Sequence, residues 1–109
     1  MSTPTIGDLE ELVLLMVAAL HDEAYGVTIL ERIEKSQGKK ANISAIHVTL
    51  KRLEDKNFVV SRTGGITQNR GGRRKKYYTI TAIGKKVLDE RYALRTRLYQ
   101  EIPNISFES

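Results

Sequence analysis

The sequence predicts an α+β fold that is mostly α: a winged helix-turn-helix of three helices and a two-stranded wing, followed by a long C-terminal helix. Three observations support this prediction. Apolar residues recur with helical periodicity in three short segments before residue 57. Two strand-like runs then bracket a loop rich in glycine and polar residues, between residues 58 and 81. Helical periodicity returns after residue 81 and continues almost to Pro103.

The first predicted helix covers residues 8–20, where apolar residues are dense. Its stripe has spacings of three and one, and consists of Leu9, Leu12, Val13, Met16, Val17 and Leu20. Acidic residues occupy its first turn, where the helix dipole favours anions. Leu14 and Leu15 broaden the apolar surface, so we expect burial on more than one side. In a 109-residue chain, that breadth suggests a partner chain.

Two more short helices follow a turn at residues 21–25. The second helix is predicted over residues 25–36, and Gly38 suits the left-handed position that ends it. The third is predicted over residues 43–56, with Asn42 as its N-cap. Its inner face has spacings of 3, 4 and 3, and consists of Ile43, Ile46, Leu50 and Leu53. The opposite face carries Ser44, Ala45, Val48, Lys51, Arg52 and Asp55.

The change of period after residue 57 predicts a β-hairpin and then the last helix. Residues 58–62 and 75–81 are predicted strands, so a basic wing spans residues 62–78. Tyr77 and Tyr78 alternate across the sheet, so one should face the core and the other outward. The last helix starts at Thr81 or Ala82 and runs to about Ile102. Its residues at 4-3-4-3 spacing form a seam typical of helix pairing: Leu88, Tyr92, Arg95, Tyr99 and Ile102.

The charge of the chain is segregated. Residues 56–88 carry nine basic side chains and no acidic one, whereas the rest of the chain sums to −4. The net charge of +5 is therefore concentrated in one third of the molecule. A local field of this kind suits a polyanion, and the default intracellular polyanion is nucleic acid.

Composition argues against several other classes of protein. There is no cysteine, and His21 and His47 alone do not make a zinc site, so we expect neither metal nor cofactor. We find no nucleophile–base cluster or phosphate-binding loop, and we expect no enzymatic activity. The longest apolar run has nine residues and no signal-peptide pattern begins the chain. We expect a cytoplasmic protein with no membrane association.

In a winged helix-turn-helix, the third helix enters the major groove and the wing reaches the phosphate backbone or the minor groove. Small residues on the outer face of helix three let it sit deep, and five cations in residues 70–76 can neutralise several phosphates. The predicted DNA-binding residues are Lys39, Lys40, Asn42, Ser44, Ala45, His47, Val48, Lys51, Arg52, Arg70, Gly71, Gly72, Arg73, Arg74, Lys75 and Lys76. His47 lies about 60° from the core side, and is as suited to local packing as to DNA contact.

Three segments carry a family resemblance. Residues 7–15 (GDLEELVLL) precede a Tyr25-Gly26 pair, residues 49–54 read TLKRLE, and residues 71–84 read GGRRKKYYTITAIG. In this order they resemble the PadR family of transcriptional regulators, over nearly the full chain. The chain departs from the family where many members have a tyrosine before the LKRLE run, here His47, and a glycine after the helix, here Asn57.

The resemblance implies a dimeric DNA-binding regulator, often a repressor, whose C-terminal helix packs on the other subunit's N-terminal helix. We therefore divide the chain into a winged-helix domain (1–81), a dimerisation helix (82–103) and a tail (104–109). The predicted dimer interface consists of Leu9, Leu12, Val13, Met16, Leu88, Tyr92, Arg95, Leu98, Tyr99 and Ile102. A two-fold dimer suits a pseudo-palindromic operator in double-stranded DNA. Many members of the family respond to a small effector, and Tyr92 and Tyr99 either line such a pocket or only pack at the seam.

Two other functions share parts of this pattern. An RNA- or ribosome-associated basic winged-helix module shares the charge argument, but the chain lacks the exposed aromatic pairs on a broad sheet that single-strand binders use. A winged helix that binds only proteins would carry a neutral or acidic wing, whereas this wing is strongly basic. Both remain alternatives to a sequence-specific regulator.

Overall fold

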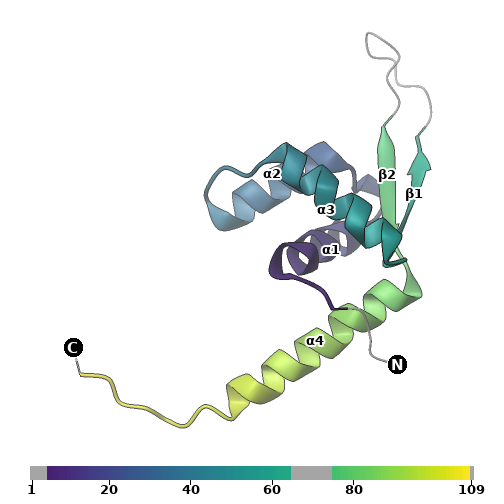
Figure 1. Ribbon diagram of the computed structural model, residues 1–109. Coiled ribbons are helices and arrows are strands. Elements are labelled where there is room, and N and C mark those ends of the chain that lie inside the picture. Colours follow the sequence, from purple (N-terminus) through teal and green to yellow (C-terminus); the bar gives the residue numbers. More distant parts are fainter. Residues whose placement is uncertain (1–4, 65–74, 109) are drawn as a thin grey trace.

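The computed structural model describes residues 5–64 and 75–108, which form four α-helices and a two-stranded antiparallel sheet (Figure 1). The elements are α1 (Asp8–Leu20), the short 3-10 turn η1 (His21–Glu23), α2 (Gly26–Gln37), α3 (Ile43–Asp55), β1 (Val59–Thr63), β2 (Lys76–Ile80) and α4 (Ala82–Gln100). Helices α1 to α3 lie together beside the hairpin, and α4 extends away from them (Figure 1). The predicted winged helix-turn-helix with a long last helix is confirmed.

The helix ends follow local capping rules. Asn42 Oδ1 accepts hydrogen bonds from the backbone N–H groups of Ser44 and Ala45, at 2.8 and 3.2 Å. Gly38 has a φ of 71° and its N–H donates to the Glu34 carbonyl at 2.8 Å, as a left-handed helix end requires. These two predicted caps are confirmed.

The last helix ends two residues before the predicted Ile102. The N–H groups of Glu101 and Ile102 each donate to a carbonyl three residues back, those of Leu98 and Tyr99, at 3.1 Å. Such bonds tighten a final turn and end the helix. Pro103 explains the early end, because its ring disfavours the helical conformation at the residue before it.

The core lies between the three short helices and the inner face of the hairpin. It consists of Ile6, Val13, Leu14, Val17, Ala24, Ile29, Ile33, Ile46, Leu50, Leu53, Phe58, Val59, Tyr78, Val87 and Leu88. Helix α1 contributes Leu14 to this core while the adjacent Leu15 is exposed. The breadth of apolar surface predicted for this helix is therefore divided between the core of the protomer and its surface.

The hairpin register decides which strand residues face the core. Val59 pairs with Ile80, Ser61 with Tyr78, and Arg62 with Tyr77. Tyr78 is 6% exposed and Tyr77 only half-buried, which confirms the predicted alternation. Burial raises the pKa of the Tyr78 phenol above its ordinary value of 10.0, so this ring stays neutral in the core.

The beginning of α4 is fastened to the residues just before β1. Thr81 caps the helix, since its Oγ1 accepts the Gly84 N–H at 3.0 Å and donates to the Asn57 carbonyl at 2.8 Å. A Cβ on Gly84 would collide with the Phe58 carbonyl oxygen, so helix and strand approach too closely for a side chain. Beyond Leu88, no residue of α4 is buried within the described chain.

A salt bridge joins the beginning of α1 to the end of α3. Lys56 Nζ lies 2.8 Å from Glu10 Oε2 and 2.7 Å from the Thr5 carbonyl oxygen. The Glu10 side chain is 12% exposed. Burial by itself raises the pKa of Glu10, but hydrogen bonds from Lys56 and from the Gly7 N–H outweigh it, and the pKa is lowered below its ordinary 4.5.

We expect Glu10→Gln to destabilise the protein at pH 7 by about 1–2 kcal/mol, because the substitution leaves Lys56 without its anion. Since the pKa of Glu10 is lower in the folded chain than in the unfolded chain, its stabilising effect is present at neutral pH. It is lost as the pH falls through the folded pKa, below 4.5. Urea unfolding at pH 7 and pH 3 measures this, and a difference between wild type and variant that is unchanged at pH 3 would contradict it.

Candidate nucleic-acid interface

The outer face of α3 presents small, apolar and basic side chains. Ser44, Val48 and Lys51 are exposed, and Arg52 lies beside them, also exposed. Ala45 is half-buried. Lys51 Nζ lies 2.9 Å from Asp55 Oδ1, one turn along the helix, and this hydrogen bond raises the pKa of Lys51 above 10.5. The ammonium group is therefore fully charged at neutral pH, and Asp55 holds it along the helix.

His47 lies where α3 meets the beginning of α2. Its side chain is against Gly26, because a Cβ built on that glycine would be 2.7 Å from His47 Cε1. The residue as a whole remains exposed. Gly26 therefore leaves room for the His47 ring, which any larger residue at this position would displace.

The connector between α2 and α3 carries Lys39 and Lys40, both exposed. The N–H of Ala41 donates to Glu34 Oε2 at 2.9 Å, which ties the end of the connector to α2. The two lysines therefore precede the N-terminus of α3, the end at which recognition helices commonly approach bases.

The predicted wing is only partly within the described residues. Lys75 and Lys76 are described, whereas Arg70, Gly71, Gly72, Arg73 and Arg74 lie outside the described residues. At the end of the described hairpin, the Gly64 N–H donates to the Lys75 carbonyl at 2.6 Å. Antiparallel pairing is thus continuous from Val59 and Ile80 to this point.

Glu54, in the last turn of α3, connects this helix to both strands of the hairpin. Ser61 Oγ of β1 donates to Glu54 Oε2 at 2.5 Å, and Lys76 Nζ of β2 lies 3.7 Å from Glu54 Oε1. Ser61 and Lys76 lie on the same face of the hairpin, two residues apart in its register. One carboxylate therefore ties both strands of the hairpin to the end of α3.

The other attachment of the hairpin is to the corner between α1 and α2. The Tyr78 N–H donates to the Ala24 carbonyl at 2.8 Å, and Tyr25 makes an isolated antiparallel bridge with Tyr77. The Tyr25 and Tyr77 rings meet edge to face, with centroids 5.2 Å apart. The corner therefore acts as a short third strand beside β2.

Two cations of the hairpin lie on these aromatic rings. Arg62 Cζ is 4.9 Å from the centroid of the Tyr77 ring. Lys75 Nζ is 4.3 Å from the centroid of the Tyr25 ring and donates to its hydroxyl at 3.1 Å. This hydrogen bond raises the pKa of Lys75 above 10.5. A ring orders a cation without neutralising it, so both charges can still attract an anion.

Sequence reasoning did not include Glu54, Ser61 or Arg62 among the site residues, and expected Tyr25 only to shape the start of α2. Tyr25 is indeed the N-cap residue of α2. Its contact with Tyr77 spans 52 positions of the chain, and no periodicity relates them. Ser61 is the partner of the buried Tyr78 in the register, so it lies on the inner face of the hairpin.

The predicted dimer residues fall into three groups by exposure. Val13 and Leu88 are buried in the core of the protomer itself, so they have almost no surface left for a partner. Leu12 and Met16 are half-buried, whereas Leu9, Tyr92, Arg95, Leu98, Tyr99 and Ile102 are exposed. The exposed group lies on the surface of α1 and along the part of α4 that leaves the body.

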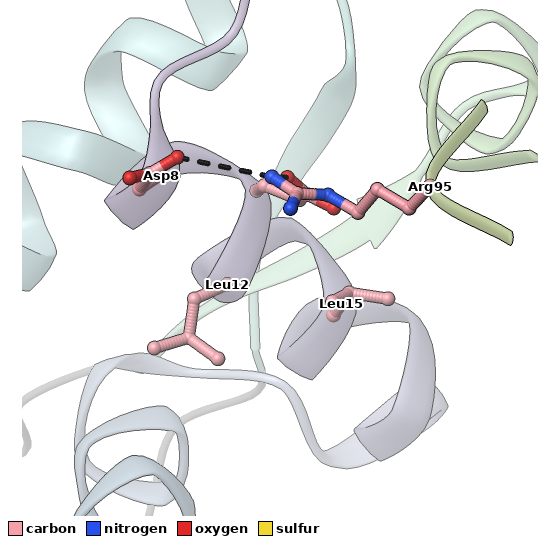
Figure 2. A pocket seen from close by; sticks show the side chains of 5 residues that line it. Asp8, Leu12, Leu15 and Arg95 are labelled. Atoms are coloured by element: carbon pink, nitrogen blue, oxygen red, sulfur yellow. Dashed lines mark hydrogen bonds and ion pairs between the residues drawn. The ribbon is translucent and has the colours of Figure 1, made fainter. Parts of the chain in front are cut away.

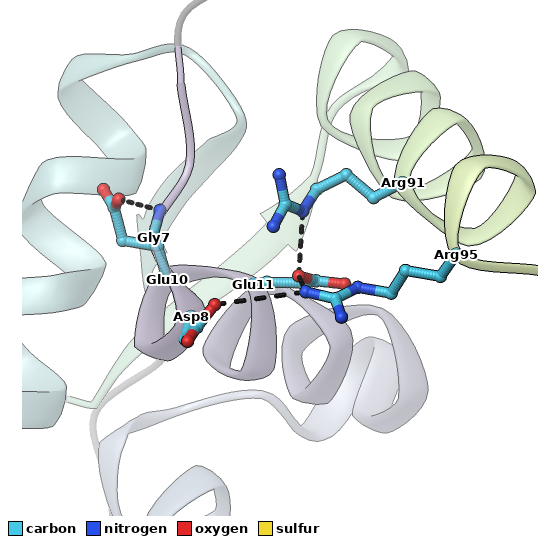
Figure 3. A network of polar contacts seen from close by, with 6 residues as sticks. All are labelled: Gly7, Asp8, Glu10, Glu11, Arg91 and Arg95. Carbon is cyan, nitrogen blue, oxygen red and sulfur yellow. Dashed lines mark hydrogen bonds and ion pairs between the residues drawn. The ribbon is translucent and has the colours of Figure 1, made fainter. Parts of the chain in front are cut away.

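A polar network holds α4 against α1 (Figure 3). Arg91 Nε donates to Glu11 Oε1 at 2.8 Å, and Arg95 Nη2 lies 3.4 Å from the same oxygen and 4.0 Å from Asp8 Oδ1. Beside it, Leu12, Leu15 and Arg95 line an open pocket between the two helices (Figure 2). Arg95, a predicted dimer residue, therefore pairs with carboxylates of its own chain.

Within the described ranges, no three Asp, Glu or His side chains are grouped as metal ligands. No helix of the described chain combines the length and the apolar character needed to cross a membrane.

Comparison with known proteins gives a consistent result. The sequence profile described as "Transcriptional regulator PadR-like family" matches residues 14–90. No curated protein matches the chain. A PadR family transcription regulator from Clostridium difficile R20291 has a similar structure, with a TM-score of 0.69 at 23% identity over 86% of this chain and 93% of that one. At this identity the likeness shows the fold alone.

Two further solved structures are similar at slightly higher identity. A PadR-like transcription factor from Bacteroides fragilis has a TM-score of 0.68 at 25% identity, covering 84% of each chain. Bacillus subtilis PadR, solved in complex with operator DNA, has a TM-score of 0.66 at 28% identity over 93% of this chain. The match covers 53% of the Bacillus protein, so this chain corresponds to about half of it.

We expect Glu54→Ala to destabilise the protein by about 1–2 kcal/mol, because the Ser61 hydroxyl loses its acceptor. Glu54→Gln keeps an acceptor oxygen and loses only the attraction to the half-exposed Lys76, so it should cost less than about 0.5 kcal/mol. Urea unfolding gives both values, and amide hydrogen exchange should be faster in β1 and β2 of Glu54→Ala. Glu90→Ala, on the exposed part of α4, is the control; equal stability of Glu54→Ala and Glu90→Ala would contradict the assignment.

Proposed function

The chain belongs to the PadR-like family of transcriptional regulators, and we propose that it is a dimeric repressor that reads a pseudo-palindromic operator. That it is a DNA-binding regulator rather than an enzyme follows from the family. The finer proposal concerns which surfaces bind DNA, how two chains associate and what binding does to transcription.

The observation that carries the proposal is the attachment of the hairpin to α3. Glu54 bonds to Ser61 and lies near Lys76, so the recognition helix and the base of the wing are adjacent parts of one surface (Figure 1). With α3 in the major groove, a wing in this position extends toward the neighbouring backbone or minor groove. Bacillus subtilis PadR, which has a similar structure, was solved in complex with operator DNA, and this supports DNA as the ligand of the present chain.

The charge distribution supports the same orientation. In the described body, several lysines are paired with carboxylates, including Lys51 with Asp55 and Lys85 with Asp89. On the outer face of the hairpin, Arg62 and Lys75 lie on aromatic rings instead. Lys75 continues a run of four cations, residues 73–76, whose first two members lie outside the described residues. We propose that this run neutralises phosphates and accounts for much of the affinity.

The exposed apolar side chains of α4 support the proposed dimer. Tyr92 and Tyr99 are 74% and 75% exposed, and Leu98 and Ile102 are at least half exposed. A helix that shows this much apolar surface beyond its own domain is typical of an interface. We propose that this part of α4 covers the exposed residues of the partner's α1, near the pocket lined by Leu12 and Leu15. Two-fold symmetry then places two α3 helices about 34 Å apart, in successive major grooves.

Selection of bound sequences from random double-stranded DNA tests the proposal as a whole. The expected result is an inverted repeat whose half-sites are about one helical turn apart. A bound repressor placed over a promoter excludes the polymerase, so transcription in vitro from a promoter that contains the selected site should fall as protein is added. No enriched sequence, or stronger binding to single-stranded RNA than to the selected duplex at equal salt, would instead favour the RNA-associated alternative.

We expect the double substitution Arg73→Ala and Arg74→Ala to weaken binding to the selected duplex. Loss of two phosphate contacts should also lower the slope of log K against log salt by about 1.8 per protomer. Fluorescence anisotropy over a salt series measures both quantities. Lys85→Ala with Lys86→Ala removes the same charge from α4 and is the matched control. An unchanged affinity and slope in the wing variant would exclude a phosphate-binding role for the wing.

We expect Leu98→Asp or Tyr92→Asp to produce monomers, because each places an unpaired carboxylate in an apolar interface. Sedimentation velocity measures the oligomeric state. Ile83→Asp is the matched control, since Ile83 is 56% exposed at the other end of α4, away from the proposed seam. Dimers that persist in both seam variants would show that the interface lies elsewhere.

A further inference from the structure

Val48 occupies the centre of the outer ridge of α3. At 100° per residue, it is about 200° around the helix from both Ile46 and Leu50, which are buried in the core. It therefore points away from the body of the protein, and 52% of its surface is exposed. A single exposed valine is ordinary on most surfaces. On a helix that enters the major groove, however, this position faces the base pairs.

The neighbours of Val48 on the ridge are polar, so Val48 is the side chain at the centre of the ridge that can make an apolar contact. Ser44 lies one turn before it, and a hydroxyl can donate to or accept from any base pair. Lys51 lies one turn after it, and its ammonium is held by Asp55 at 2.9 Å. Arg52, which is also exposed, lies one turn after Val48 as well, so a guanidinium fork is available next to the centre of the ridge. The position of Val48 itself offers only an apolar side chain.

Helix propensity does not favour a valine here. A β-branched residue is a poorer helix former than alanine, so Val48 lowers the intrinsic stability of α3 relative to an alanine at the same position. Its neighbour Thr49, also β-branched, is buried and donates to the Ala45 carbonyl at 2.7 Å. Val48 is therefore an exposed apolar side chain on a face where an apolar contact with a ligand is available.

We propose that Val48 is a specificity-determining residue, whose side chain contacts the C5 methyl group of thymine in the major groove. The inference rests on the proposed function, because it requires α3 to lie in that groove. Thymine is the base that presents a methyl group there, so the contact favours a T·A pair at the facing position. Cytosine offers an amino group at the corresponding edge, and an apolar side chain would leave that donor without an acceptor.

The test uses the duplex selected from random DNA, with each thymine replaced singly by deoxyuridine. Deoxyuridine keeps every hydrogen-bonding group of thymine and lacks only the methyl. For wild type, we expect one or two positions in each half-site where this replacement weakens binding by about threefold to fivefold, the effect of uncovering one methyl group. In Val48→Ala, the loss at those same positions should nearly disappear.

Val27→Ala is the matched control, since Val27 is an exposed helical valine on α2, with 51% exposure. It should keep the wild-type pattern of sensitivity to deoxyuridine. Val48→Ala should melt at or above the wild-type temperature, because alanine is the better helix former, so a change in binding cannot arise from unfolding. The inference is overturned if replacement of thymine by deoxyuridine has no effect on wild-type binding, or if its effect is fully retained in Val48→Ala. In either case the selected repeat and its salt dependence still support the proposed function. If no sequence is enriched at all, both fall.

Discussion

The hairpin is attached to the body of the protein at one face and along the edge of β2, and this double attachment determines how the hairpin lies relative to α3. On one face, Tyr78 enters the core and Glu54 of α3 holds Ser61 and Lys76. At the outer edge, Tyr25 from the α1–α2 corner pairs with Tyr77. A two-stranded hairpin is only marginally stable alone. Here it is stabilised by a helix on one side and by a strand-like corner on the other.

Some cations of the described chain are held by carboxylates and others by aromatic rings. Lys56 is bound to Glu10, and its role is to join α1 to the end of α3. Lys75 and Arg62 are ordered by tyrosine rings, which hold a cation near a surface while its charge remains available to an anion. The basic hairpin seen in the sequence therefore has a structural counterpart, since the described cations of its outer face lie on tyrosine rings, whereas several lysines of the helices, including Lys51 and Lys85, lie beside carboxylates.

Helix α4 extends from this assembly because only its first two turns belong to the core. Gly84, Val87 and Leu88 are buried, and Arg91 and Arg95 then connect the helix to Glu11. Past that point the apolar side chains are exposed. The ion pairs hold α4 in the direction in which it leaves the body. In a symmetric dimer, the partner's α4 would leave its own body in the same direction. The distance between two recognition helices in such a dimer depends on it.

Local rules made the helices and strands predictable from the sequence. Asn42, Gly38 and Thr81 mark helix ends because each satisfies backbone groups within a few residues of itself, and the helical periodicity of residues 43–53 placed Ile46 and Leu50 in the core. Only the tertiary structure decided which residues of distant segments contact one another. The sequence pattern did not connect Glu54 with Lys76 or Tyr25 with Tyr77, and it placed Val13 and Leu88 at a dimer seam although the protomer buries both. The physical reason is that periodicity identifies which face of an element is apolar, whereas the packing of the elements decides what covers that face.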